Sequence, residues 1–343
     1  MEENPPTSIK SCPQCKTTIA PGLLICPGCQ TLVYGKELQA LAKEAEQCVS
    51  EGKFSEGLSR WRKALELLPL GSRQYTIITE KIQELNKKVD AQSSSGQGAR
   101  KQNVPPGWLA FGGLGVFLWK FKFLLITLLS KGKLLLLGLT KAQTFFSMFL
   151  AFGVYWAAWG WKFALGLILS IYVHEMGHVF ALKKFGIPAT APVFIPGVGA
   201  FVRLKQSLLS PIEDARVGLA GPWGGLAAAV VCYAVYLTTG WPVWGAIAKV
   251  GAWINLFNLL PWVPLDGGRG FQALGVRQKW IAAGIMACMW FITQEGLLVL
   301  LFLVGVVNAV GSKTAEVKDT RTLIEYSFLV IIFSLLSKIP VSV

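Results

Sequence analysis

Charged residues are scarce in this chain of 343 amino acids, and their scarcity argues against an ordinary soluble protein. Asp, Glu, Lys and Arg make up 15% of the residues, against about a quarter in soluble domains. Hydrophobic residues make up 53%, and the mean hydropathy is +0.49. Because so much of the chain is apolar, including 20 Phe and 13 Trp, a disordered or collagen-like chain is excluded as well.

Acidic residues are rarest in the most apolar part of the chain. Residues 107–343 hold 19 Lys or Arg and 8 Asp or Glu, a net charge of +11, whereas residues 1–106 hold 14 and 11, a net charge of +3. The basic residues lie between hydrophobic runs and form no dense blocks. This pattern is typical of loops that face the anionic cytoplasmic side of a membrane, and it argues against nucleic acid as a partner.

The 7 cysteines are too few for a secreted disulfide scaffold, and the first 30 residues lack the basic and apolar segments of a signal peptide. Four of the cysteines form two Cys-x-x-Cys pairs, Cys12 with Cys15 and Cys26 with Cys29. Such pairs can offer four thiolates to one zinc ion, which would stabilise a segment too short to have its own core. Residues 8–35 therefore resemble a zinc ribbon with a structural zinc; disulfides or free thiols are the alternative.

Residues 36–90 are predicted to form a soluble helical segment. Apolar residues recur at helical spacing in two stretches of residues 36–68, and a third helix is expected at about 74–89. The segment resembles one tetratricopeptide unit, which would dock a cytoplasmic protein partner through residues 8–90; a helical spacer is the alternative. Residues 91–106 have the composition of a flexible linker.

Residues 107–343 are predicted to be a transmembrane domain, so the expected fold is mainly α: a polytopic bundle of membrane-spanning helices. Apolar runs approach or reach the membrane length of about 17–25 residues at 143–160, 162–182, 215–239, 243–263, 279–293, 296–310 and 326–336. The apolar stretch 108–139 is interrupted by lysines and stays undecided. When the loops between these runs are assigned alternately to the two sides of the membrane, Lys162 is the only basic residue in the outer turns. This distribution predicts a multi-pass protein of the cell membrane with a cytoplasmic N-terminus.

The chain has only 2 histidines, and both belong to one His-Glu-x-x-His motif, formed by His174, Glu175 and His178. A spacing of four residues places both imidazoles on one face of a helix, where they can bind zinc while the glutamate acts as a general base. Two packed histidines beside a glutamate are the alternative. Three such groups inside an apolar run are costly, which favours metal binding.

A catalytic zinc ion usually takes a third protein ligand, and Asp266 is the acidic residue that stands out. It follows an apolar run that ends with two prolines, Pro261 and Pro264, which break a helix. The adjacent Gly267 and Gly268 are expected to let the chain bend near the carboxylate. An ordinary Asp-Gly turn is the alternative.

Together, these motifs resemble the site-2 protease family of intramembrane zinc metalloproteases. The family pattern is a His-Glu-x-x-His in one span and Asn-x-x-Pro…Leu-Asp-Gly in a later one, matched here at residues 174–178 and 258–267. Residues 211–222 also look like the family's stretch before its middle span. The resemblance covers about residues 130–275 and includes neither the cysteine module nor the helical segment.

The resemblance implies specific roles for residues of this chain. His174, His178 and Asp266 would bind a catalytic zinc ion, Glu175 would be the general base, and Asn258 would help to hold the substrate. Residues 186–204 would form a membrane-embedded sheet or loop. The glycines 221, 224 and 225 are expected to serve helix packing more than chemistry.

The function predicted from the sequence is an intramembrane zinc endopeptidase that cleaves transmembrane segments of proteins embedded in the same lipid. It would hold two zinc ions, one catalytic and one structural. Two other classes remain open: a non-catalytic membrane adaptor that recruits partners through its N-terminal modules, and a transporter, although no inverted repeat is evident.

Overall fold

The fold is taken from a computed structural model that describes residues 11–20, 22–95, 142–197, 199–202, 210–312 and 318–341. The chain divides into two compact units. Unit 1 comprises Met1–Ala99 with Lys183–Pro188, and unit 2 comprises Arg100–Leu182 with Ala189–Val343. Residues 96–106 of the predicted linker and the undecided stretch 108–139 lie outside the described residues.

Unit 1 begins with the cysteine module, which has two isolated antiparallel bridges, Ser11 with Thr18 and Ile25 with Leu32. Three helices follow: α1 (Gly35–Ser50), α2 (Phe54–Glu66) and α3 (Arg73–Ser95). Helix α2 packs against both α1 and α3, as the amphipathic spacing predicts. Helix α3 is longer than expected and includes the first residues of the predicted linker, so the composition of that stretch did not mark the helix end.

Unit 1 also includes the six residues 183–188, which come much later in the sequence. Arg62 is only 3% exposed, and its Nε donates a hydrogen bond of 2.9 Å to the carbonyl of Phe185. Ser55 Oγ donates one of 2.8 Å to the carbonyl of Lys184. At Gly186 φ is +68°, and a side chain there would meet the α2 backbone. Buried polar groups need such partners, which local sequence patterns do not reveal.

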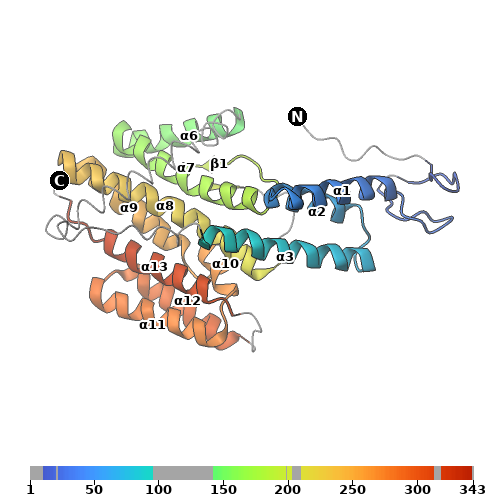
Figure 1. Cartoon of the computed structure of the whole chain (residues 1–343). Coiled ribbons are helices and arrows are strands. Elements are labelled where there is room, and N and C mark those ends of the chain that lie inside the picture. The colour runs from blue at the N-terminus through green and yellow to red at the C-terminus, as the bar shows by residue number, and fades with distance from the viewer. Residues whose placement is uncertain are drawn as a thin grey trace, which may run out of the picture. The chain divides into compact units, whose positions relative to one another are not determined.

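Unit 2 is built mainly from helices (Figure 1). The helices are α6 (Ala142–Trp159), α7 (Trp161–Lys184, whose last two residues belong to unit 1), α8 (Pro211–Thr239), α9 (Pro242–Asn258), α10 (Asp266–Gln272), α11 (Val276–Thr293), α12 (Gly296–Gly311) and α13 (Thr320–Leu336). Each apolar run expected to span a membrane is largely helical here. Within the described residues, α7 and α8 are long and apolar enough to cross a membrane, and α12 is apolar but shorter.

Residues 186–204, which were expected to form a sheet or loop, contain a small hairpin. Strand β1 (Val193–Ile195) pairs antiparallel with β2 (Gly199–Phe201), and Phe194 lies opposite Ala200. Figure 1 shows β1 beside α6, and the two elements are in contact. Phe194 is buried in a cluster with apolar side chains of α6 and α7, which explains why this face of the hairpin is apolar.

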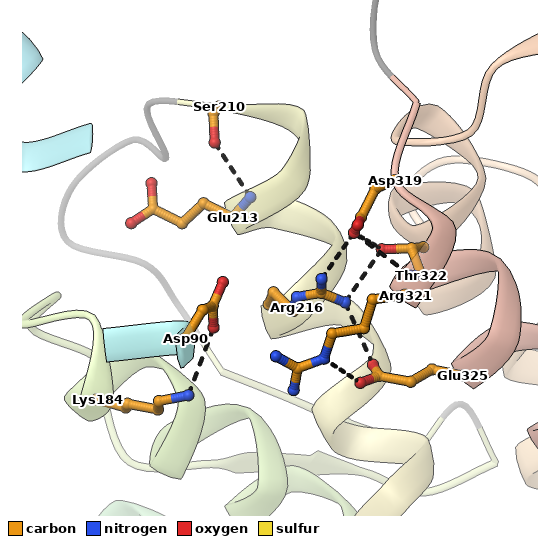
Figure 2. Close-up of polar contacts among 9 residues, drawn as sticks. All are labelled: Asp90, Lys184, Ser210, Glu213, Arg216, Asp319, Arg321, Thr322 and Glu325. Atoms are coloured by element: carbon orange, nitrogen blue, oxygen red, sulfur yellow. Dashed lines mark hydrogen bonds and ion pairs between the residues drawn. The ribbon is translucent and has the colours of Figure 1, made fainter. Parts of the chain in front are cut away.

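The main core of unit 2 lies among α8, α9, α11, α12 and α13. It includes Leu256, Leu298, Leu301 and Phe333, all fully buried. A polar network joins α8 to α13 (Figure 2): the guanidinium of Arg216 lies 2.7 Å from Asp319 Oδ2. Buried charges are tolerated when paired in this way, so the network fixes these two helices against each other.

The chain around Asp266 differs from the bend expected at its glycines. Gly267 and Gly268 lie in helix α10, which begins at Asp266 itself. A Cβ atom at Gly267 would overlap the carbonyl of Leu259, and one at Gly268 would overlap the backbone of Trp262. These glycines therefore allow close packing of α10 onto the preceding segment, and the chain turns before Asp266.

Candidate metal centre

Helix α7 brings the two histidines together because they are one helical turn apart. The His174 and His178 rings are 5.0 Å apart between centroids, and the residues are 5% and 7% exposed. Their Nε2 atoms lie 3.3 Å apart. Both imidazoles thus point their outer nitrogens at one buried position.

Helix α10 supplies the third side chain from a distant part of the sequence. Asp266 Oδ2 lies 3.0 Å from His174 Nε2 and 3.3 Å from His178 Nε2. The aspartate side chain is 12% exposed. The structure therefore unites the three residues that the sequence analysis named as zinc ligands.

Hydrogen bonds on the other side of each ring fix its orientation. His178 Nδ1 lies 2.8 Å from the carbonyl oxygen of Val217, which can only accept, so this nitrogen donates. His174 Nδ1 lies 2.8 Å from Asn255 Oδ1, while Asn255 Nδ2 donates to the carbonyl of Gly251. In a neutral imidazole with a protonated Nδ1, Nε2 carries a lone pair. Each ring is thus held in the tautomer that binds metal.

These residues fit a zinc ion. Two lone pairs and a carboxylate that face one another repel unless a cation lies among them. Around a tetrahedral zinc with Zn–N distances of about 2.0–2.1 Å, neighbouring ligand atoms are about 3.3–3.4 Å apart. The separations here are 3.0 to 3.3 Å. The arrangement leaves the fourth position for water or substrate, as in catalytic zinc sites.

Glycines of α8 leave the space that the two rings occupy. A Cβ atom at Gly221 would overlap Nε2 of His178, and one at Gly225 would overlap the amide of Asn255. Across the same helix pair, Gly177 of α7 lies against the carbonyl of Ala220. Helix packing is therefore the role of these glycines, as expected, but at Gly221 and Gly225 they pack against the centre itself.

Glu175 lies beside the three ligands and is distinct from them. It is 5% exposed and interacts electrostatically with both histidines and Asp266. A buried carboxylate next to a cation site can take up and release a proton without being a ligand.

The asparagine that contacts the centre is Asn255, which the sequence analysis did not single out. Asn258, proposed there to hold substrate, is the last residue of α9 and is partly exposed. Among the described contacts, none joins Asn258 to the three ligands. Asn255 lies three residues before Asn258 on the same helix. Asn255 is 3% exposed, and only the fold shows this burial.

The four cysteines of unit 1 also converge. Their Sγ atoms all lie within 4.8 Å of one another, with Cys12 and Cys29 at 3.6 Å and Cys15 and Cys26 at 3.5 Å. None of these four cysteines forms a disulfide. A hydrogen bond with the Thr17 hydroxyl lowers the pKa of Cys15 to about 6, which favours the thiolate that binds metal. The spacing fits Zn–S distances of about 2.3 Å.

Comparison with known proteins bears on the same region. Residues 162–249 match the sequence model of Peptidase family M50. The chain contains a peptidase family M50 domain. The matched residues include His174, Glu175 and His178 and end before Asp266, so the third residue of the centre comes from outside the match.

Two curated relatives are named as zinc metalloproteases. Over 123 residues the chain is 28% identical to Zinc metalloprotease MJ0392 of Methanocaldococcus jannaschii, covering 34% of each chain. Over 132 residues it is 32% identical to Putative zinc metalloprotease Rip3 of Mycobacterium tuberculosis, covering 35% of this chain and 32% of the relative. The chain spans about a third of the length of these relatives. Together with the M50 domain, these names support a metalloprotease.

Replacement of Asn255 by leucine should weaken metal binding. Leucine has a similar size but offers no acceptor to His174 Nδ1, and loss of such a partner typically costs about 10–100-fold in metal affinity. Zinc competition against a chromophoric chelator measures the effect. Asn255→Asp keeps an acceptor in the same place and should retain most of the affinity. Wild-type affinity in Asn255→Leu would show that the ring is oriented by other contacts.

Proposed function

We propose that this protein is an intramembrane zinc endopeptidase that cleaves transmembrane segments of other proteins. The observation that carries the proposal is the buried convergence of two imidazole Nε2 atoms and one carboxylate oxygen, with Glu175 beside them. The M50 domain and the metalloprotease relatives agree with this chemistry.

The reaction is peptide bond hydrolysis. His174, His178 and Asp266 would hold zinc, which when bound makes water more acidic and polarises a carbonyl group. Glu175 takes the proton of the attacking water on its carboxylate and passes it to the leaving amine. Val217 and Asn255 keep the histidine rings in the required tautomer throughout.

The outer surface of unit 2 supports a multi-pass membrane location. Large apolar side chains are exposed on several helices, and contiguous patches of this kind mark contact with lipid or protein. On α6 the exposed fractions reach 69% at Phe146 and 61% at Trp159. The basic loops favour a cytoplasmic N-terminus.

The burial of the centre among apolar helices supports transmembrane segments as the substrate class. A transmembrane helix satisfies its own backbone groups, so it must unwind before a carbonyl can be attacked. The partly exposed Asn258 and the β1–β2 hairpin are available to hold the unwound chain. Unit 1 would bind a second, structural zinc through its four cysteines and could dock a cytoplasmic partner through its helices.

The test is a comparison of membrane proteins in cells that produce the wild type or a His174→Ala/His178→Ala variant. The wild type should generate at least one new chain end inside the apolar segment of a membrane protein, which identifies the substrate. The variant should leave that protein intact. Identical chain ends in both cells, with both proteins present at equal levels, would contradict the proposal.

A further inference from the structure

The segment 259–265, between α9 and α10, leads directly to Asp266. Helix α9 cannot continue through it because Pro261 and Pro264 have no N–H to donate. The last carbonyls of a helix need other partners. In the described part of the chain, the carbonyls of Leu259 and Pro261 accept no hydrogen bond from a backbone N–H. Leu259 and Pro261 are both buried, so these carbonyls depend on side-chain donors.

Side chains from the last two helices supply those donors. Asn308 of α12 donates from Nδ2 to the carbonyl of Pro261 at 2.7 Å. The hydroxyl of Tyr326, on α13, donates to the carbonyl of Leu259. Tyr326 is fully buried, and its ring lies 5.5 Å from that of Phe271 on α10. Buried carbonyls are nearly always hydrogen-bonded, so these two donors hold the segment against α12 and α13.

The position of this segment affects the position of Asp266, the third residue of the centre. Gly267 packs directly against the Leu259 carbonyl, with no room for a Cβ atom between them. A shift of that carbonyl must therefore move the first turn of α10, which contains Asp266. Helix α13 is itself held on α8 by Arg216, the neighbour in sequence of Val217, whose carbonyl orients His178 (Figure 2).

We infer that Asn308 and Tyr326 are positioning residues for the metal centre: they hold Asp266 at its distance from His174 and His178 through the carbonyls of Pro261 and Leu259. Helices α12 and α13, which lie beyond the residues 162–249 that match the family model, thereby help to position a metal ligand. The inference rests on the proposed function in one respect, the role of Asp266 as a ligand.

Cobalt binding to the full-length protein tests this inference. Thiolate-bound cobalt at the cysteine cluster and cobalt at the histidine centre absorb differently, so one titration follows both sites. In an Asn308→Leu/Tyr326→Phe variant, affinity at the histidine centre should fall about tenfold or more, the lower range for lost supporting contacts. The cysteine cluster should bind as in the wild type.

Two further variants separate positioning from a general loss of packing. Tyr326→Phe alone removes one oxygen and keeps the ring on Phe271, so it should fold and still bind cobalt less tightly at the histidine centre. Ser334→Ala, also on α13, removes a buried hydroxyl that donates only to its own helix at Ile331. This control should keep wild-type affinity.

Wild-type cobalt affinity in both Asn308→Leu/Tyr326→Phe and Tyr326→Phe would overturn the inference, and so would an equal loss in Ser334→Ala. A wild type with no cobalt at the histidine centre would overturn it together with the proposed function. A wild type that binds cobalt but cleaves no membrane protein would reject the proposed function alone, and the affinities of the variants would still decide the inference.

Discussion

Glu175→Gln should abolish proteolysis while the metal stays bound. Glutamine has the same shape but cannot accept the proton of the attacking water, and general acid–base catalysis contributes about 10²–10⁴-fold in rate. Zinc content should not change, because Glu175 is not among the three converging ligand atoms. The measurement is cleavage of the identified substrate by the purified protein, alongside zinc per chain.

A second buried glutamate offers a matched control. Glu213 on α8 is 3% exposed, against 5% for Glu175, and it is not part of the centre. Glu213→Gln should keep most of the activity. Full activity in Glu175→Gln would assign the proton transfer to another group, and loss of zinc in that variant would mean that Glu175 holds the metal.

Asp266→Ala should empty the histidine centre and stop cleavage. Two imidazoles alone bind zinc poorly compared with the three protein ligands usual in catalytic sites. Metal analysis of the purified protein should therefore fall from two zinc ions per chain to one, the remaining ion at the cysteine cluster. Cleavage should fall below detection, since neither water nor carbonyl would then be activated.

The control for this variant is another partly buried acid in unit 2. The side chain of Glu295 is 13% exposed, close to the 12% of Asp266, and it pairs with Lys338 at 3.1 Å. Glu295→Ala removes a comparable charge from a place outside the centre and should keep both zinc ions. Two zinc ions per chain in Asp266→Ala would show that the third ligand lies elsewhere.

Much of this site could be predicted from local patterns. The His-Glu-x-x-His spacing needs only the helical repeat to place His174 beside His178, and the two Cys-x-x-Cys pairs need only tight turns. Helix positions followed from apolar runs of sufficient length. The bend expected at Gly267 was wrong because packing overrides local preference there: α10 must approach Leu259, and a glycine inside the helix allows it. Helix α3 also continues to Ser95, into a stretch with the composition of a linker.

The residues around the ligands could not be found in this way. Asn255 differs from Asn258 only in which face of α9 it occupies, and Asn308 and Tyr326 are more than 40 positions from the carbonyls they bind. Local periodicity is a property of one helix at a time. It does not say which neighbouring helix meets which carbonyl, so no pattern in the sequence marks these contacts.

The sequence by itself determined the chemistry of this protein: the two imidazoles, the adjacent glutamate, the four thiols and the apolar helices, because each depends on residue type and short spacing. The tertiary structure brought Asp266, which the sequence had already singled out, to the histidines. It alone decided what orients the two rings and which side chains of the last two helices bind the carbonyls that precede Asp266. Those features arise when α7, α8, α9 and α10 pack closely enough that buried polar groups must find partners on one another.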